Sequence, residues 1–131
     1  MNRSATYISV LLIGLIGAGI LYSRSLPYPF VWDDTAVIKD NHYLRTPGNW
    51  DLFFHPDFWK KMLPISRVDY RPLQMIALKI ITRAVGQTAL YFRLVNIIFH
   101  LGISFLVWLM GRRFFRRPAI PLMAALLFAF H

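Results

Sequence analysis

The stretch ATYISVLLIGLIGAGILY, residues 5–22, decides the fold class of this chain because it holds no charged side chain. An α-helix of this length is long enough to cross the ~30 Å hydrocarbon core of a bilayer. The alternative is a cleaved secretory signal, but no clear small-x-small cleavage site follows the run and further apolar runs come later. We therefore expect an uncleaved N-terminal transmembrane helix in residues 1–24.

The composition is typical of a membrane protein and not of a soluble domain. Hydrophobic residues make up 56% and aromatic residues 16% of the 131 residues, and the formal net charge is +9. Because the basic residues are split among apolar runs, we expect membrane lipid and no nucleic acid as a partner. The chain has no cysteine, so disulfide and thiol chemistry are excluded.

Outside the first span, polar and apolar segments alternate. Residues 25–89 hold all six acidic residues and many aromatic ones, so we expect an external segment with interfacial helices. Residues 90–111 predict a second transmembrane helix, residues 112–117 a basic cytoplasmic loop, and residues 118–131 an incomplete third transmembrane helix. The predicted fold is an all-α membrane protein with two full transmembrane helices plus the start of a third. The positive-inside rule places the N-terminus in the cytoplasm and residues 25–89 on the extracytoplasmic side.

One helix of the external segment has clear end signals. Pro72 near its start and Gly86 after its end predict a helix over about residues 73–85. This helix is too short to cross the bilayer and its apolar run is interrupted by Gln74, Lys79 and Arg83. We expect an interfacial or half-buried helix; the alternative is a short true span.

Asp33 and Asp34 are the first candidate for chemistry, because they follow the first span by about ten residues. Two neighbouring carboxylates can divide labour, one as general base and the other as ligand of a divalent cation. The alternative is that Asp34 caps a short helix over about residues 35–40 and Asp33 is a solvated charge.

Tyr70-Arg71-Pro72 is the second candidate. Arg71 would stand at the start of the expected helix, on the same side of the membrane as Asp33, and its planar fork of donors suits a phosphate. The alternative is an arginine that extends to ordinary lipid headgroups.

A polar stripe on the second span is the third candidate. Arg93, Asn96, His100 and Ser104 are spaced by three, four and four residues, so they share one helical face. Hydrogen bonding between helices explains Asn96 and Ser104 well. His100 is also a candidate to bind a pyrophosphate or sugar, or to ligate a metal or tetrapyrrole.

Five stretches, in this order and spacing, resemble a family of GT-C glycosyltransferases related to the protein O-mannosyltransferases and often fused to tetratricopeptide repeats. The stretches are FVWDDTAVIKDN (30–41), WDLFF (50–54) with DFW (57–59), YRPL (70–73), NIIFH (96–100) and FAFH (128–131).

The resemblance implies transfer of a sugar from a polyprenyl-phosphate donor to an acceptor hydroxyl outside the cytoplasm. It assigns the role of catalytic base to Asp33 or Asp34, and binding of the lipid phosphate to Tyr70, Arg71, Asn96 and His100. Enzymes of this superfamily need many more spans, so we expect an N-terminal portion that is inactive alone.

A second hypothesis needs no catalysis. The chain would be a small accessory subunit of a larger membrane complex, packed against other membrane helices. In that version His100 or His131 is a candidate ligand of a pigment or haem.

Overall fold

The computed structural model describes residues 3–62 and 70–131, and these residues form helices and no strand. The chain divides into two compact units. One unit comprises Met1–Pro27 with Arg93–His131, and the other comprises Tyr28–Phe92. Each unit has its own hydrophobic core, so each is described by itself.

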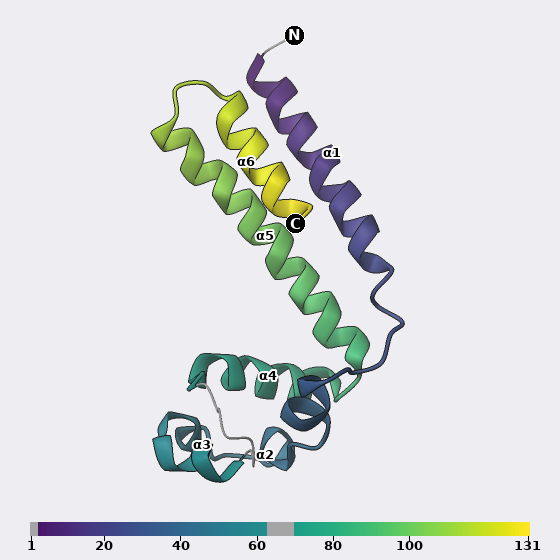
Figure 1. Cartoon of the computed structure of the whole chain (residues 1–131), viewed down its shortest axis with the longest axis vertical. Helices are drawn as coiled ribbons and strands as arrows, with labels where there is room; N and C mark the ends of the chain where they lie inside the picture. The colour runs from purple at the N-terminus through teal and green to yellow at the C-terminus, as the bar shows by residue number, and fades with distance from the viewer. Residues whose placement is uncertain (1–2, 63–69) are drawn as a thin grey trace. The chain divides into compact units, whose positions relative to one another are not determined.

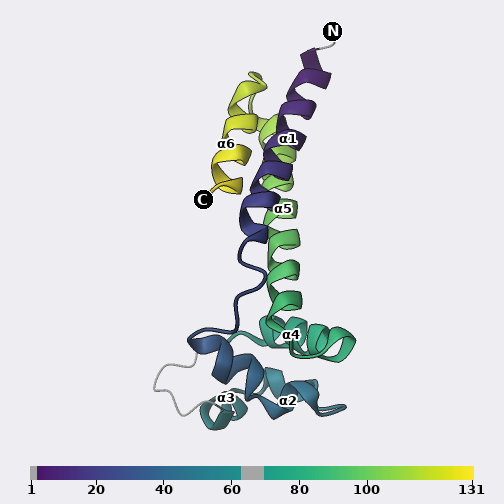
Figure 2. The same ribbon diagram turned by 90° about the vertical axis from the view of Figure 1, so that its right-hand side faces the viewer.

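Three helices build the first unit: α1 (Arg3–Ser23), most of α5 (Ala89–Phe114) and α6 (Ala119–Ala129). Helix α6 turns back and lies beside both α1 and α5 (Figures 1 and 2). Helices α1 and α5 are long and apolar enough to cross a membrane, and only 11% of each apolar window is buried. Their outward faces therefore need lipid or further helices around them. The all-α membrane fold expected from the sequence is confirmed.

Helix α5 continues further than the sequence analysis predicted. Arg112 and Arg113 lie in its last turn, not in a loop, and the amide of Phe115 still donates to the carbonyl of Gly111 at 2.9 Å. Arginine is a good helix former and its charge is favourable near a helix C-terminus, so the helix ends only as Pro118 approaches.

Small residues allow the helices of the first unit to approach closely. Its core contains Leu11, Trp108, Leu122 and Ala125. A Cβ atom added at Gly111 would lie 2.6 Å from the Cβ and 3.2 Å from the Cα of Pro121, so α5 and α6 touch at this position. Without a hydrophobic effect inside the bilayer, such close van der Waals packing is a main source of helix association.

We expect Gly111→Ala to lower the free energy of unfolding by about 1–2 kcal/mol, because the rigid ring of Pro121 cannot move away from the new methyl group. Gly102→Ala is the matched control, since nothing lies within 4 Å of a Cβ there. That control should gain up to ~1 kcal/mol from helix propensity. Denaturant titration of the detergent-solubilised chain, followed by circular dichroism, measures both; equal stability of the two variants would contradict the packing.

The second unit folds the aromatic-rich segment around one longer helix. Its elements are the π-helix η1 (Thr35–Lys39), α2 (His42–Arg45), the 3₁₀ helix η2 (Asp51–Phe54), α3 (Pro56–Met62) and α4 (Pro72–Val85). Helix α4 packs on α2 and η2. The buried core consists of Ile38, Leu44, Phe53, Trp59, Met75 and Phe92.

Helix α4 confirms the helix predicted at this place. Pro72 occupies its first turn, and Gly86 follows its end with a φ of 83°. The left-handed backbone at this position favours glycine, which has no Cβ to clash with the preceding turn. Whether α4 lies at a membrane interface stays a prediction.

The burial of Lys79 in α4 was not predicted from the sequence. In the sequence this lysine interrupts the apolar run of the helix, but the side chain is fully buried. Its Nζ donates a hydrogen bond to the carbonyl of Gly48 and lies 4.9 Å from the ring centroid of Trp50 and 5.3 Å from that of Phe53. Burial lowers the pKa of Lys79 from 10.5, the nearby charge of Arg83 lowers it further, and Asp51 opposes both effects.

The lowered pKa predicts how stability depends on pH. Between the lowered value and 10.5 the unfolded chain binds more protons than the folded chain, so the free energy of unfolding rises as the pH increases toward 10.5. We expect this rise to be lost in Lys79→Met and kept in Lys39→Met, which replaces an exposed lysine. Urea unfolding between pH 8 and 10.5 checks both variants; identical pH profiles for the two would refute the assignment.

Candidate functional site

Asp33 and Asp34 lie in the turn that leads into η1. The amide of Asp34 donates to the carbonyl of Val31 at 3.1 Å, and the amide of Thr35 donates to that of Trp32 at 3.2 Å. Asp33 is exposed and Asp34 is half-buried. Asp34 occupies the N-cap position of η1, as predicted, but its side chain makes no capping hydrogen bond. Capping therefore does not explain why a carboxylate stands at this position.

Trp32 gives this turn an unusual conformation that the sequence did not reveal. Its φ is 50°, and its side chain is 94% exposed. A bulky residue rarely adopts the left-handed region, and such local strain is concentrated at functional sites. The strained residue stands directly before Asp33 in the sequence.

The Asp pair by itself is a poor metal site. Among the described residues, no group of three or more histidine, cysteine, aspartate or glutamate side chains could hold a metal ion. Asp33 and Asp34 thus supply two carboxylates, and a divalent cation there would take its other ligands from water or substrate.

Tyr70 and Arg71 lie at the start of α4. The hydroxyl of Tyr70 donates to the carbonyl of Phe54 at 3.0 Å, and its ring meets that of Trp59 edge to face at 5.7 Å. Arg71 is the N-cap residue of α4 and is followed by Pro72 in the first turn. Tyr70 thus ties the start of α4 to η2, and this contact positions Arg71.

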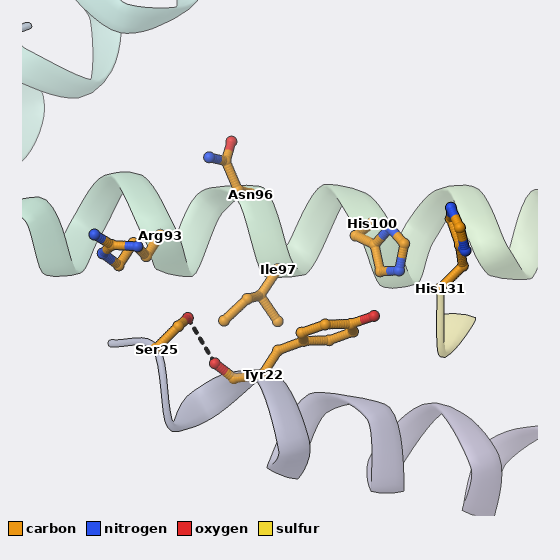
Figure 3. Close-up of a pocket in the computed structure, with 7 residues that line it drawn as sticks. All are labelled: Tyr22, Ser25, Arg93, Asn96, Ile97, His100 and His131. Atoms are coloured by element: carbon orange, nitrogen blue, oxygen red, sulfur yellow. Dashed lines mark hydrogen bonds between the residues drawn. The ribbon is translucent and has the colours of Figure 1, made fainter. Parts of the chain in front are cut away.

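A pocket of about 330 Å³ lies within the first unit (Figure 3). It is lined by Tyr22, Ser25, Arg93, Asn96, Ile97, His100 and His131. The helical spacing had placed Arg93, Asn96 and His100 on one face, and the structure brings these three to one pocket. Tyr22 and Ser25 were missed, because no sequence spacing relates the end of α1 to the middle of α5.

His100 takes part in packing between helices. Its Nε2 lies 3.2 Å from the carbonyl oxygen of Ala129 at the end of α6, and its ring stacks on Phe128 at 5.1 Å and meets Tyr22 edge to face at 5.3 Å. Because a carbonyl oxygen can only accept, this contact is a hydrogen bond in which Nε2 donates. Ligation of a haem or metal through Nε2 would require this contact to break.

The residues predicted for one site are divided between the two units. Asp33, Asp34, Tyr70 and Arg71 belong to the second unit, whereas Asn96 and His100 belong to the first. Ser104, the last member of the polar stripe, is buried and donates to the carbonyl of His100 in its own helix at 2.8 Å. Its role is thus internal to α5.

Comparison with characterised proteins finds relatives along most of the chain. Protein O-mannosyl-transferase TMTC1 of Homo sapiens is 36% identical over 123 residues, which cover 89% of this chain and 14% of that protein. Protein O-mannosyl-transferase TMTC4 of Homo sapiens is 33% identical over 137 residues, covering 92% and 18%. Protein O-mannosyl-transferase Tmtc1 of Drosophila melanogaster is 32% identical over 136 residues, covering 99% and 16%.

This chain therefore spans less than a fifth of the length of these relatives. No family model matches the chain, and no solved structure matches it.

The contacts of His100 predict a loss of stability when the ring is removed. We expect His100→Leu to lower the free energy of unfolding of the first unit by about 1–2 kcal/mol, through the lost hydrogen bond to Ala129 and the lost ring contacts. Asn96→Leu, at an exposed position of the same helix, should change it by less than about 0.5 kcal/mol. Thermal unfolding in detergent compares the two; a stability loss confined to Asn96→Leu would show that the packing role is wrong.

Proposed function

Over most of its length this chain is homologous to protein O-mannosyl-transferases, and on that basis we propose that it is the N-terminal portion of a polytopic glycosyltransferase. The enzyme moves a sugar from a polyprenyl-phosphate donor to an acceptor hydroxyl on the extracytoplasmic side. The N-terminus lies in the cytoplasm and residues 25–89 lie outside. The names of the relatives make mannose the first sugar to test.

In this proposal, Asp33 or Asp34 is the catalytic base. The carboxylate takes the proton of the acceptor hydroxyl while the hydroxyl oxygen bonds to the anomeric carbon. The bond from that carbon to the lipid phosphate breaks on the opposite face, and the phosphate leaves with the electron pair, so the configuration inverts. The observation that carries the assignment is the pair itself: Asp33 is exposed, Asp34 makes no capping bond, and a strained Trp32 precedes both.

Arg71 and Tyr70 are the proposed phosphate-binding residues of the second unit. A guanidinium matches phosphate oxygens with two parallel donors, and negative charge that grows on a leaving phosphate is stabilised by such preset donors. The contact of Tyr70 with Phe54 supports this role, because it holds the start of α4 in place.

Asn96 and His100 are the proposed phosphate-binding residues of the first unit. They border the pocket that also contains Arg93. An amide such as that of Asn96 and an imidazole such as that of His100 can both donate hydrogen bonds to phosphate oxygens.

An accessory role in a membrane complex is the second candidate. The observation in its favour is the outward apolar surface of α1 and α5, which is large enough to pack against further helices. The same surface is required if the chain continues into a larger transferase, so activity separates the two candidates.

We expect Asp33→Asn and Asp34→Asn to identify the base by activity. The chain is placed in protein O-mannosyl-transferase TMTC1 in exchange for its homologous segment, and transfer of radiolabelled mannose from dolichyl phosphate mannose is measured. Loss of a general base should lower the rate by about 10²–10⁴-fold.

Asp40→Asn is the matched control, because it removes an exposed carboxylate from the same segment and should leave the rate unchanged. A chimera that transfers mannose at the full rate with both Asp33 and Asp34 replaced would overturn the proposal. A chimera that is inserted in the membrane but inactive without any substitution would favour the accessory role.

A further inference from the structure

The end of the first unit where α5 meets α6 carries a dense positive charge. Arg112 and Arg113 lie in the last turn of α5, and Arg116 and Arg117 lie in the connection to α6. All four side chains are exposed. We call these four residues, together with Phe114 and Phe115 between them, the arginine cluster.

The first unit has no aspartate or glutamate side chain to neutralise this charge. Its basic residues are Arg3, Arg24, Arg93 and the four of the arginine cluster, and all six acidic residues of the chain lie between positions 33 and 69, outside this unit. Four like charges within six residues repel one another, so the cluster is more stable when anions surround it.

The cluster also has apolar contacts suited to a lipid surface. Phe114 and Phe115 are 76% and 49% exposed between the two arginine pairs. The guanidinium of Arg112 lies 4.8 Å from the ring centroid of Trp108, which stands one helical turn earlier in α5. This cation–π contact stabilises the charge of Arg112. Exposed aromatic rings beside arginines at the end of a spanning helix are typical of a membrane–water interface.

The start of α6 adds to the same attraction. Pro118 is its N-cap residue and provides no side-chain capping hydrogen bond. The positive end of the helix dipole favours an anion, and Arg116 and Arg117 directly precede this terminus.

From the charge, the exposed rings and the helix dipole together, we propose that the arginine cluster binds the phosphate groups of anionic phospholipids in the adjoining leaflet. Two guanidinium forks hold the phosphate oxygens, and the phenyl rings insert among the first carbons of the acyl chains. This function is independent of glycosyl transfer, and it assigns a ligand to residues that the proposed transferase chemistry does not use.

The test titrates the delipidated chain in detergent with phosphatidylglycerol or phosphatidylcholine and counts bound lipids by native mass spectrometry. We expect selective retention of phosphatidylglycerol, and about 30-fold weaker binding for the double variant Arg116→Gln/Arg117→Gln, which corresponds to about fivefold for each arginine near an anionic surface. Equal retention of the two lipids by the unmodified chain would overturn the proposal whatever the variants do.

A matched control separates a local site from overall charge. Lys39→Gln/Arg83→Gln removes two exposed positive charges from the other unit and should leave the affinity for phosphatidylglycerol unchanged. An equal loss in both double variants would show that net charge alone attracts the lipid. Displacement of the lipid by inorganic phosphate at constant ionic strength would show that a free anion, and not a lipid, is the ligand.

Discussion

A helix in hydrocarbon must satisfy its backbone hydrogen bonds internally, and the architecture of the first unit depends on this constraint. Helices α1 and α5 meet it because each forms its backbone hydrogen bonds within one segment. Their long uncharged runs leave most of the apolar side chains facing outward. Because lipid is as apolar as leucine, association with α6 must come from close contact. Gly14 and Gly111 permit that contact, against Leu126 and Pro121 respectively.

The second unit solves a different problem, because it must bury aromatic side chains without long helices. One buried cation contributes to this packing. The ammonium group of Lys79 lies 4.9 Å from the ring centroid of Trp50 and 5.3 Å from that of Phe53, and it donates to the carbonyl of Gly48. A buried charge is tolerated only when such partners replace water, so these contacts connect α4 to the turn that precedes η2. The lowered pKa of Lys79 records the remaining cost of burial.

The candidate catalytic and phosphate-binding residues are divided between the two units. The Asp33–Asp34 pair directly follows the strained residue Trp32, and Arg71 lies where α4 begins. In the first unit, Arg93 and His100 border one pocket, while the contact of His100 with Ala129 also joins α5 to α6. A substitution at such a residue alters both the packing between the helices and the lining of the pocket. His100 should therefore be studied with stability and activity measured together.

Long uncharged runs, helix end signals and helical spacing were enough to predict the helical membrane fold, helix α4 and the shared face of Arg93, Asn96 and His100, because these features depend on one chain segment at a time. The end of α5 was placed too early, since the arginines that indicated a loop are also good helix formers. The burial of Lys79, the left-handed turn at Trp32 and the joining of Tyr22 and Ser25 to the pocket could not be predicted. The left-handed φ of Trp32 has no local sequence signal, because a bulky residue rarely adopts it. The burial of Lys79 and the composition of the pocket depend on segments that are distant in sequence and meet only after packing, where the loss of water, and not local preference, decides which contacts form.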